Sequence, residues 1–234
     1  MSHSNFDMSA PHEGRLATGA RAEFIANTYI HVLGAMVGFV LVVMAFFATG
    51  VTEAMFQFVA GNQFGWLMML GGFVLVGNLA SGVAHRAVSK TSQYAALAGF
   101  VTAEALFFSP ILFIANSYMP GAIQSAAVVT LLGFAGLTGI AFISRKDFSF
   151  MGAILKWVGM GALLAIVGGM LFGFVLGTWF MVGMIVFAGA AILYQTSNVI
   201  RIYPEDRYVA ASLELFSSVA LMFYYVLMLF MSRD

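Results

Sequence analysis

The chain consists of seven long apolar runs that are joined by short links. A helix of about 20 mostly apolar residues crosses the hydrocarbon core of a bilayer, and each run reaches that length. Because backbone groups in lipid must form their hydrogen bonds within their own segment, such runs predict a bundle of helices. We therefore expect an all-α, polytopic membrane protein with seven transmembrane helices. The expected spans are 24–49, 64–86, 93–117, 122–144, 150–174, 178–200 and 208–231.

The composition supports a chain that is solvated mainly by the lipid bilayer. Apolar residues make up 62% of the sequence and charged residues 9%, against about 45–50% and about 25% in soluble domains. Ten acidic and ten basic residues are too few to cover a soluble protein of this size. The formal net charge is zero, which gives no basis for nucleic-acid binding. The chain has no cysteine, which excludes disulfides and thiolate sites.

Nine of the ten Lys and Arg residues fall on one side of the expected bundle. Basic residues concentrate on the cytoplasmic side of membrane proteins, so we expect the N-terminus inside the cell and the C-terminus outside. Only Arg233 lies on the opposite side. The nine are Arg15, Arg21, Arg86, Lys90, Arg145, Lys146, Lys156, Arg201 and Arg207.

The expected spans divide the chain into three parts. Residues 1–23 are rich in Ser, Gly, Ala and charge, so we expect a disordered cytoplasmic tail with little to bury. Residues 24–231 form the transmembrane domain, and residues 232–234 form a short external end. The first apolar run is longer than the roughly 7–15 residues of a signal-peptide core, which predicts that it stays as an anchor.

Small residues recur at every fourth position through the fifth run and just beyond it. Such a repeat places a ridge of small residues on one helix face, where another helix can approach closely. We expect this ridge to pack within the bundle, and a homo-oligomer through the same face is the alternative. The ridge consists of Gly161, Ala165, Gly169, Gly173 and Gly177.

Two acidic residues, Glu104 and Glu214, lie within expected spans. Charge at membrane depth is costly, which makes both residues functional candidates. At 1.5 Å per residue, they lie about 16 Å and about 9 Å from the cytoplasmic ends of their spans. We expect a polar cavity open to the cytoplasm; alternatively, both glutamates are protonated or bonded to neighbouring helices and serve no transport. The other expected cavity residues are Asn78, Gln195, Ser217 and Ser218.

Catalytic and metal-binding patterns are missing from the sequence. It contains no His-Glu-x-x-His zinc motif and no Gly-x-Ser-x-Gly nucleophile elbow. His31 and His85 lie within spans, where a single histidine more often bonds a neighbouring helix than catalyses a reaction. His3 and His12 lack the spacing of metal ligands. We therefore expect no enzyme, no cofactor and no metal site.

Several motifs, in this order and spacing, resemble the Bax inhibitor family of seven-span membrane proteins. The likeness covers nearly the whole chain after about residue 20 and is strongest with the YccA-type branch of bacterial inner-membrane proteins. That resemblance implies a multi-pass protein of the bacterial cytoplasmic membrane. The motifs are "NTY" (27–29), "GFVTAEALFFSPIL" (99–112), "SRKDFSFMGAIL" (144–155), "ILYQTSNVI" (192–200) and "YVAASLELFSS" (208–218).

The resemblance also marks a pair of substituted positions. Ion-conducting members carry two aspartates, one in each of the last two spans, that share a proton and form a pH sensor. Those positions are Gln195 and Ser218 in this chain, and neither side chain can ionise. Arg86 corresponds to the basic residue that pairs with the aspartates in those members. The conducting mechanism therefore does not carry over to this chain unchanged.

The YccA-type resemblance implies a regulatory role with protein partners. Members of this branch bind the membrane AAA protease FtsH with HflK and HflC, and they both restrain the protease and are degraded by it. The N-terminal tail would suit a protease that must first grip a free end. The alternative function is a cation leak, of calcium or protons, through the cavity of Glu104 and Glu214.

Overall fold

The computed structural model describes residues 10–144 and 146–232, with side chains from residue 19 onward. The described part contains α-helices and one short 3₁₀ helix, and no strand. The helices are α1 (Ala10–Ala48), α2 (Val51–Gly61), α3 (Gly65–Arg86), α4 (Lys90–Tyr118), α5 (Ala122–Ser144), α6 (Met151–Phe172), α7 (Thr178–Arg201), η1 (Glu205–Arg207) and α8 (Tyr208–Met231).

Seven of these helices are long and apolar enough to cross a membrane, which confirms the expected all-α polytopic fold. Two local features add to the expected spans. Helix α1 begins at Ala10, within the expected tail 1–23; residues 1–9 lie outside the described part. The link 50–63 contains the additional helix α2, which is too short to span a bilayer and packs against α4.

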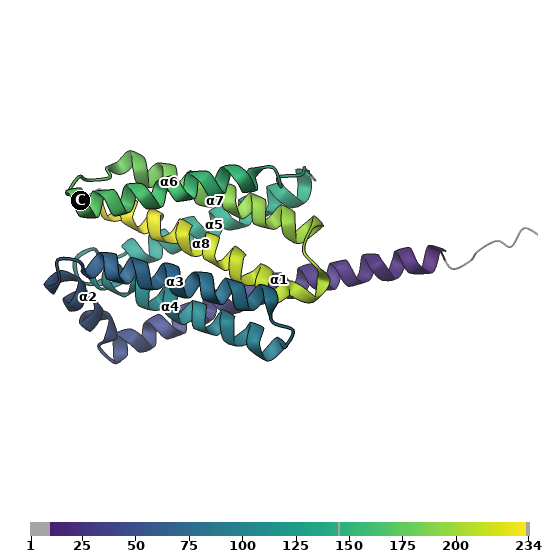
Figure 1. The fold of residues 1–234 in the computed structure, drawn as a ribbon, viewed down its shortest axis with the longest axis horizontal. Coiled ribbons are helices and arrows are strands. Elements are labelled where there is room, and N and C mark those ends of the chain that lie inside the picture. Colours follow the sequence, from purple (N-terminus) through teal and green to yellow (C-terminus); the bar gives the residue numbers. More distant parts are fainter. Residues whose placement is uncertain (1–9, 145, 233–234) are drawn as a thin grey trace, which may run out of the picture.

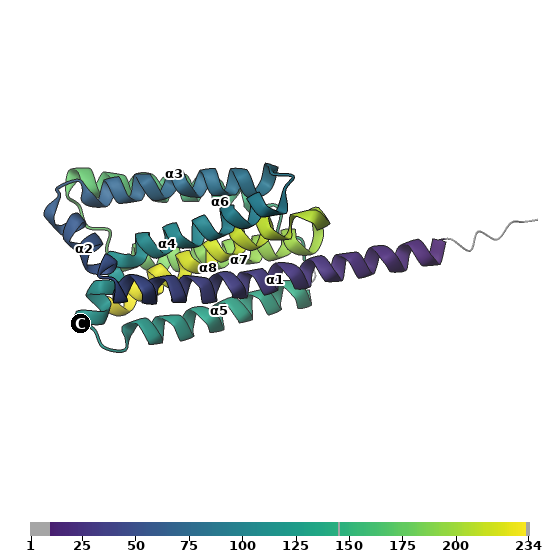
Figure 2. The same cartoon turned by 90° about the horizontal axis from the view of Figure 1, so that it is seen from below.

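Helix α8 lies at the centre of the bundle although it is the last helix in chain order. It packs against α1, α3, α4, α5 and α7, and Figure 1 shows it running between the α3–α4 pair and the α5–α7 group. In the perpendicular view of Figure 2, α1 and α5 lie along its other side. The best-buried spans are α4 and α8, with 56% of the most apolar window buried in each.

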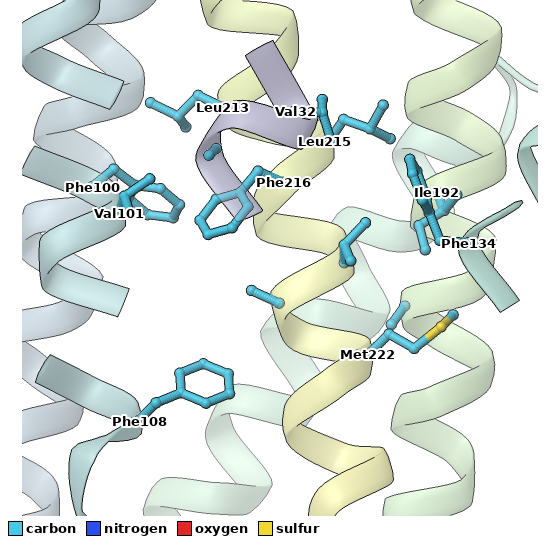
Figure 3. Packing of buried hydrophobic residues seen from close by; sticks show 14 of the residues in the cluster. Val32, Phe100, Val101, Phe108, Phe134, Ile192, Leu213, Leu215, Phe216 and Met222 are labelled. Carbon is cyan, nitrogen blue, oxygen red and sulfur yellow. The ribbon is translucent and has the colours of Figure 1, made fainter. Parts of the chain in front are cut away.

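The core around α8 is built from aromatic and aliphatic side chains (Figure 3). Phe108 of α4 is 1% exposed and lies among three aromatic rings. It stacks on Phe223 at 5.7 Å between ring centroids and meets the edges of Phe39 and Tyr224 at 5.3 Å each. Edge-to-face and offset-stacked pairs are the geometries that aromatic rings prefer. These rings join α1, α4 and α8 into one packed unit.

The loops α3–α4, α5–α6 and α7–α8 lie at one end of the bundle, from which the N-terminal part of α1 projects (Figures 1 and 2). The basic residues of the sequence concentrate at this end, which the positive-inside rule predicts to be the cytoplasmic one. At this end, Arg21 joins α1 to the C-terminal end of α7 and the link after it. Its guanidinium donates to the carbonyl oxygens of Val199, Ile200 and Tyr203, which satisfies carbonyls that the end of α7 leaves free.

Helix α6 is peripheral, and the expected small-residue ridge does not run along it as a packing seam. Among its described residues none is buried. The helix ends at Phe172, so Gly173 and Gly177 lie beyond it, and Gly161 has open space where a Cβ would stand. Of the ridge residues, Gly169 lies close only to the link after α6, where a Cβ would stand 3.0 Å from the carbonyl oxygen of Phe174. Close approach to α7 occurs at two other glycines of α6, seven residues apart. A Cβ on Gly152 would lie 2.7 Å from the Tyr194 hydroxyl, and one on Gly159 would lie 3.2 Å from Phe187.

Candidate functional site

A cavity of about 320 Å³ opens between α3, α4, α7 and α8. We call it the polar cavity because six of its lining residues carry polar side chains. Those six are Asn78, Ser81, Gln195, Glu214, Ser217 and Ser218. The structure thus brings five of the sequence-predicted cavity residues around one space, with Ser81 as an addition.

Glu214 is the one carboxylate among the described residues that line the polar cavity, and it has partners on two neighbouring helices. Gln195 Nε2 of α7 donates to Glu214 Oε2 over 2.8 Å. Ser81 Oγ of α3 donates to Glu214 Oε1 over 3.3 Å. His85 Nε2, also on α3, lies 3.4 Å from the same oxygen. A partly buried carboxylate needs donors such as Gln195 and Ser81 to offset the loss of water, so Glu214 joins α3, α7 and α8 at the cavity wall.

The tautomer of His85 follows from its other contacts. His85 Nδ1 lies 2.9 Å from the carbonyl oxygen of Ser81, which can only accept, so Nδ1 carries a hydrogen. In the neutral ring Nε2 is then an acceptor, and the Tyr203 hydroxyl lies 3.4 Å away to donate to it. Burial, and secondly the charge of Glu214, raise the pKa of Tyr203 well above its ordinary value, which keeps that hydroxyl protonated. The Glu214 carboxylate can only accept, so its 3.4 Å contact with Nε2 is a hydrogen bond only in a ring that carries hydrogens on both nitrogens.

The positions that resemble the family's paired aspartates lie on the same cavity but do not bond each other. Gln195 is bonded to Glu214, as described above, and Ser218 Oγ donates to the backbone oxygen of Glu214 over 3.2 Å. Asn78 bonds the carbonyl oxygen of Val74 in its own helix. The acid of this site is therefore Glu214, one helical turn before Ser218.

Glu104 and Arg86 stand apart from the polar cavity. Glu104 of α4 is 3% exposed and lines a neighbouring cavity of about 510 Å³ together with Ser217 and Tyr224. The expectation that Glu104 and Glu214 share one space was therefore wrong. Arg86, the last residue of α3, does not line either cavity and has no ion pair with the described residues, so its expected role as a basic partner is not supported by the geometry.

The sequence patterns did not predict that His85, Ser81 and Tyr203 belong to the site. Ser81 and His85 are four residues apart, which places both on one face of a helix, and this spacing was the available signal. Tyr203 could not be placed from the sequence, because it lies in the link after α7 and reaches the site only through the turn of the chain into η1.

Two comparisons with known proteins follow from the sequence. The family model described as "Inhibitor of apoptosis-promoting Bax1" matches residues 21–234. The uncharacterised protein PA2604 of Pseudomonas aeruginosa is 34% identical over 110 residues, which is 46% of this chain and 49% of that protein. The matched part spans about half the length of this curated relative. Because the family model covers nearly the whole membrane domain, the chain belongs to the Bax inhibitor family of membrane proteins.

Proposed function

We propose that this protein is a regulatory member of the Bax inhibitor family that binds the membrane AAA protease FtsH with HflK and HflC. In this role it both restrains the protease and serves as its substrate. The proposal rests on the YccA-type motifs and on one structural observation. The N-terminal part of α1 projects beyond the bundle at the end that carries the basic loops (Figures 1 and 2).

A projecting segment suits a protease that pulls its substrates from the cytoplasmic side. Residues 10–18 form the first turns of α1 and precede the apolar run that begins at residue 24. Helix ends fray because the N–H groups of the first turn have no partner within the helix, so this stretch can be unravelled from its end. The helical start of α1 is therefore compatible with a handle for threading.

We expect deletion of residues 2–18 to block degradation by FtsH while co-purification with the protease is retained. The reason is that the deletion removes the segment to be threaded and leaves the membrane spans, through which binding would occur. A pulse-chase measures the half-life, and affinity capture from native membranes measures binding.

The control restores the length of the segment but not its sequence. An unrelated Gly/Ser-rich stretch of 17 residues in the same place should restore degradation, because threading depends on a flexible end. The proposed handle is wrong if the deleted form decays at the full-length rate, and the partnership itself is wrong if full-length protein does not capture FtsH.

A second candidate function, a cation leak, is favoured by the arrangement of the two cavities. Ser217 lines both of them, so the spaces around Glu214 and Glu104 adjoin in the interior of the bundle. The two carboxylates could bind a proton or cation one after the other as it crosses the bundle. The missing aspartate pair argues against the acid-sensed calcium conduction of other members.

In proteoliposomes we expect calcium flux to equal that of protein-free vesicles at every pH from about 5 to 8, because no coupled acid pair is present. Calcium entry is measured with an encapsulated indicator and proton entry with a pH-sensitive dye. Glu104→Gln and Glu214→Gln serve as matched variants of similar shape. A proton flux that both variants abolish would establish the leak, and an acid-blocked calcium flux would contradict our expectation.

A further inference from the structure

The larger cavity, which we call the apolar cavity, is of the size that small-molecule sites occupy. It has a volume of about 510 Å³, within the range of roughly 300–1,000 Å³ that is usual for ligand pockets. It is lined by residues of α3, α4, α6, α7 and α8 and of the link between α6 and α7, and the walls are mainly aromatic and aliphatic. Typical wall residues are Phe73, Phe107, Leu163, Phe180 and Met184.

Glu104 supplies the carboxyl group of this cavity, and the described part of the chain provides no partner for it. Its side chain is 3% exposed, lines the cavity and forms no hydrogen bond or ion pair with any described residue. Glu214, in contrast, is bonded by Gln195 and Ser81. No Lys, Arg or His is among the residues that line the cavity. An unpaired charge at such a place is strongly unfavourable, so Glu104 either keeps its proton or pairs with a counter-charge that comes from outside the chain.

The geometry argues against two kinds of occupant. A calcium ion needs about six to eight oxygen ligands, and the described residues contain no group of three acidic or histidine side chains that could hold a metal. A phospholipid would have to bring its head group to Glu104, which is fourteen residues from either end of α4. That distance is about 21 Å along the helix, which is too deep for a head group that stays at the membrane surface.

An amine that dissolves in the membrane satisfies all of these constraints. A protonated nitrogen would pair with Glu104, and an apolar body would fill the remaining space. Phe73, Phe107 and Tyr224 line the same cavity, and the faces of aromatic rings attract ammonium groups within about 6 Å. Helix α6 lies between this cavity and the surface of the bundle, because its described residues are all at least partly exposed and it contributes Ala162 and Leu163 to the wall. An amine that enters beside α6 would come directly from the bilayer.

We propose that the apolar cavity is a binding site for a lipophilic amine, with Glu104 as the anchor for its nitrogen. The ligand class is a single protonated amine on an apolar chain or ring system of about a dozen carbon atoms. This site is separate from the polar cavity and does not depend on binding to a protease.

Equilibrium binding of radiolabelled N,N-dimethyldodecylamine to the full chain in phosphatidylcholine nanodiscs tests the proposal, with empty nanodiscs subtracted. We expect saturable binding of one molecule per chain. Glu104→Gln should weaken amine binding about tenfold or more, because it removes the charge at the same size. Binding of the uncharged probe 1-dodecanol should not change between wild type and Glu104→Gln.

A second pair of variants tests the cavity independently of Glu104. Ala162→Phe fills the space from the α6 side and should abolish binding of the amine. Ala153→Phe, on the same helix but outside the cavity lining, should leave it unchanged. Equal amine binding by wild type and Glu104→Gln would overturn the proposal, as would binding that does not saturate above the lipid background. Dodecanol binding as tight as that of the amine would assign the cavity to acyl chains and overturn it too.

Discussion

Replacing Gln195 with glutamate is expected to make the stability of this protein depend strongly on pH. In the wild type the Gln195 amide donates to Glu214 over 2.8 Å. Glutamate at this position would put two carboxyl groups in the same contact, and like charges about 4 Å apart repel by about 4 kcal/mol at an effective dielectric constant of 20. The pair would therefore hold one shared proton.

The sign of the pH dependence follows from whether the folded or the unfolded variant binds that proton more tightly. The folded variant holds it more strongly than the unfolded chain, in which the two carboxyls are apart, so folding is favoured at low pH. The stability of Gln195→Glu should be closest to that of the wild type near pH 5 and should fall as the pH rises and the shared proton is lost. Thermal unfolding in nanodiscs across this range measures the change.

A swapped variant is the matched control. Gln195→Glu combined with Glu214→Gln restores one amide and one carboxyl and should return the profile of the wild type. His85 faces Glu214 from α3, so both profiles should be repeated with His85→Gln. If Gln195→Glu unfolds with the same pH dependence as the swapped variant, the two side chains do not meet as described.

Phe108→Ala is expected to destabilise the fold by about 3 kcal/mol. The ring is 1% exposed and packs on Phe39, Phe223 and Tyr224, so its removal leaves a void at the junction of three helices. The expected loss of stability lies at the low end of the range for Phe→Ala changes because lipid tails are as apolar as a protein core. In a bilayer, helix association therefore depends on packing contacts and gains little from transfer out of water.

Unfolding in mixed micelles, with a denaturing detergent as titrant, measures this loss. Phe172→Ala is the control, because Phe172 at the end of α6 is 82% exposed and should face lipid tails. We expect the control to stay within about 0.5 kcal/mol of the wild type. Equal midpoints for the two variants would mean that the aromatic cluster does not hold α1, α4 and α8 together.

The spans could be predicted from the sequence because the length and hydropathy of a run are local properties. The boundaries of α3 and α5 agree with the runs 64–86 and 122–144 to within one residue. Helix α2 was missed because it is too short to stand out as a span. Its signal was the spacing of Thr52 and Val59, which are seven residues apart and are its two buried residues.

The depth of the site residues in the membrane could be predicted from the sequence, but the direction in which each helix points its side chains could not. Counting residues from the helix ends placed Gln195 and Glu214 at similar depths, and the structure brings them into contact. The same counting could not say which way Glu104 faces, because the rotation of a helix about its axis is set by its packing neighbours. Glu104 therefore lies on a different cavity, and Arg86, at the end of its helix, reaches none.

The central position of α8 has a consequence for the order in which the protein is made. Helices enter the membrane as the ribosome delivers them, so α1 to α7 are inserted before the helix around which they pack. Until α8 arrives, Gln195 and Ser81 lack the carboxylate that they bond in the finished protein, and Phe108 lacks Phe223 and Tyr224. A chain stalled before Tyr208 is then a set of inserted but unassembled helices with unpaired polar groups, the form that membrane quality control removes.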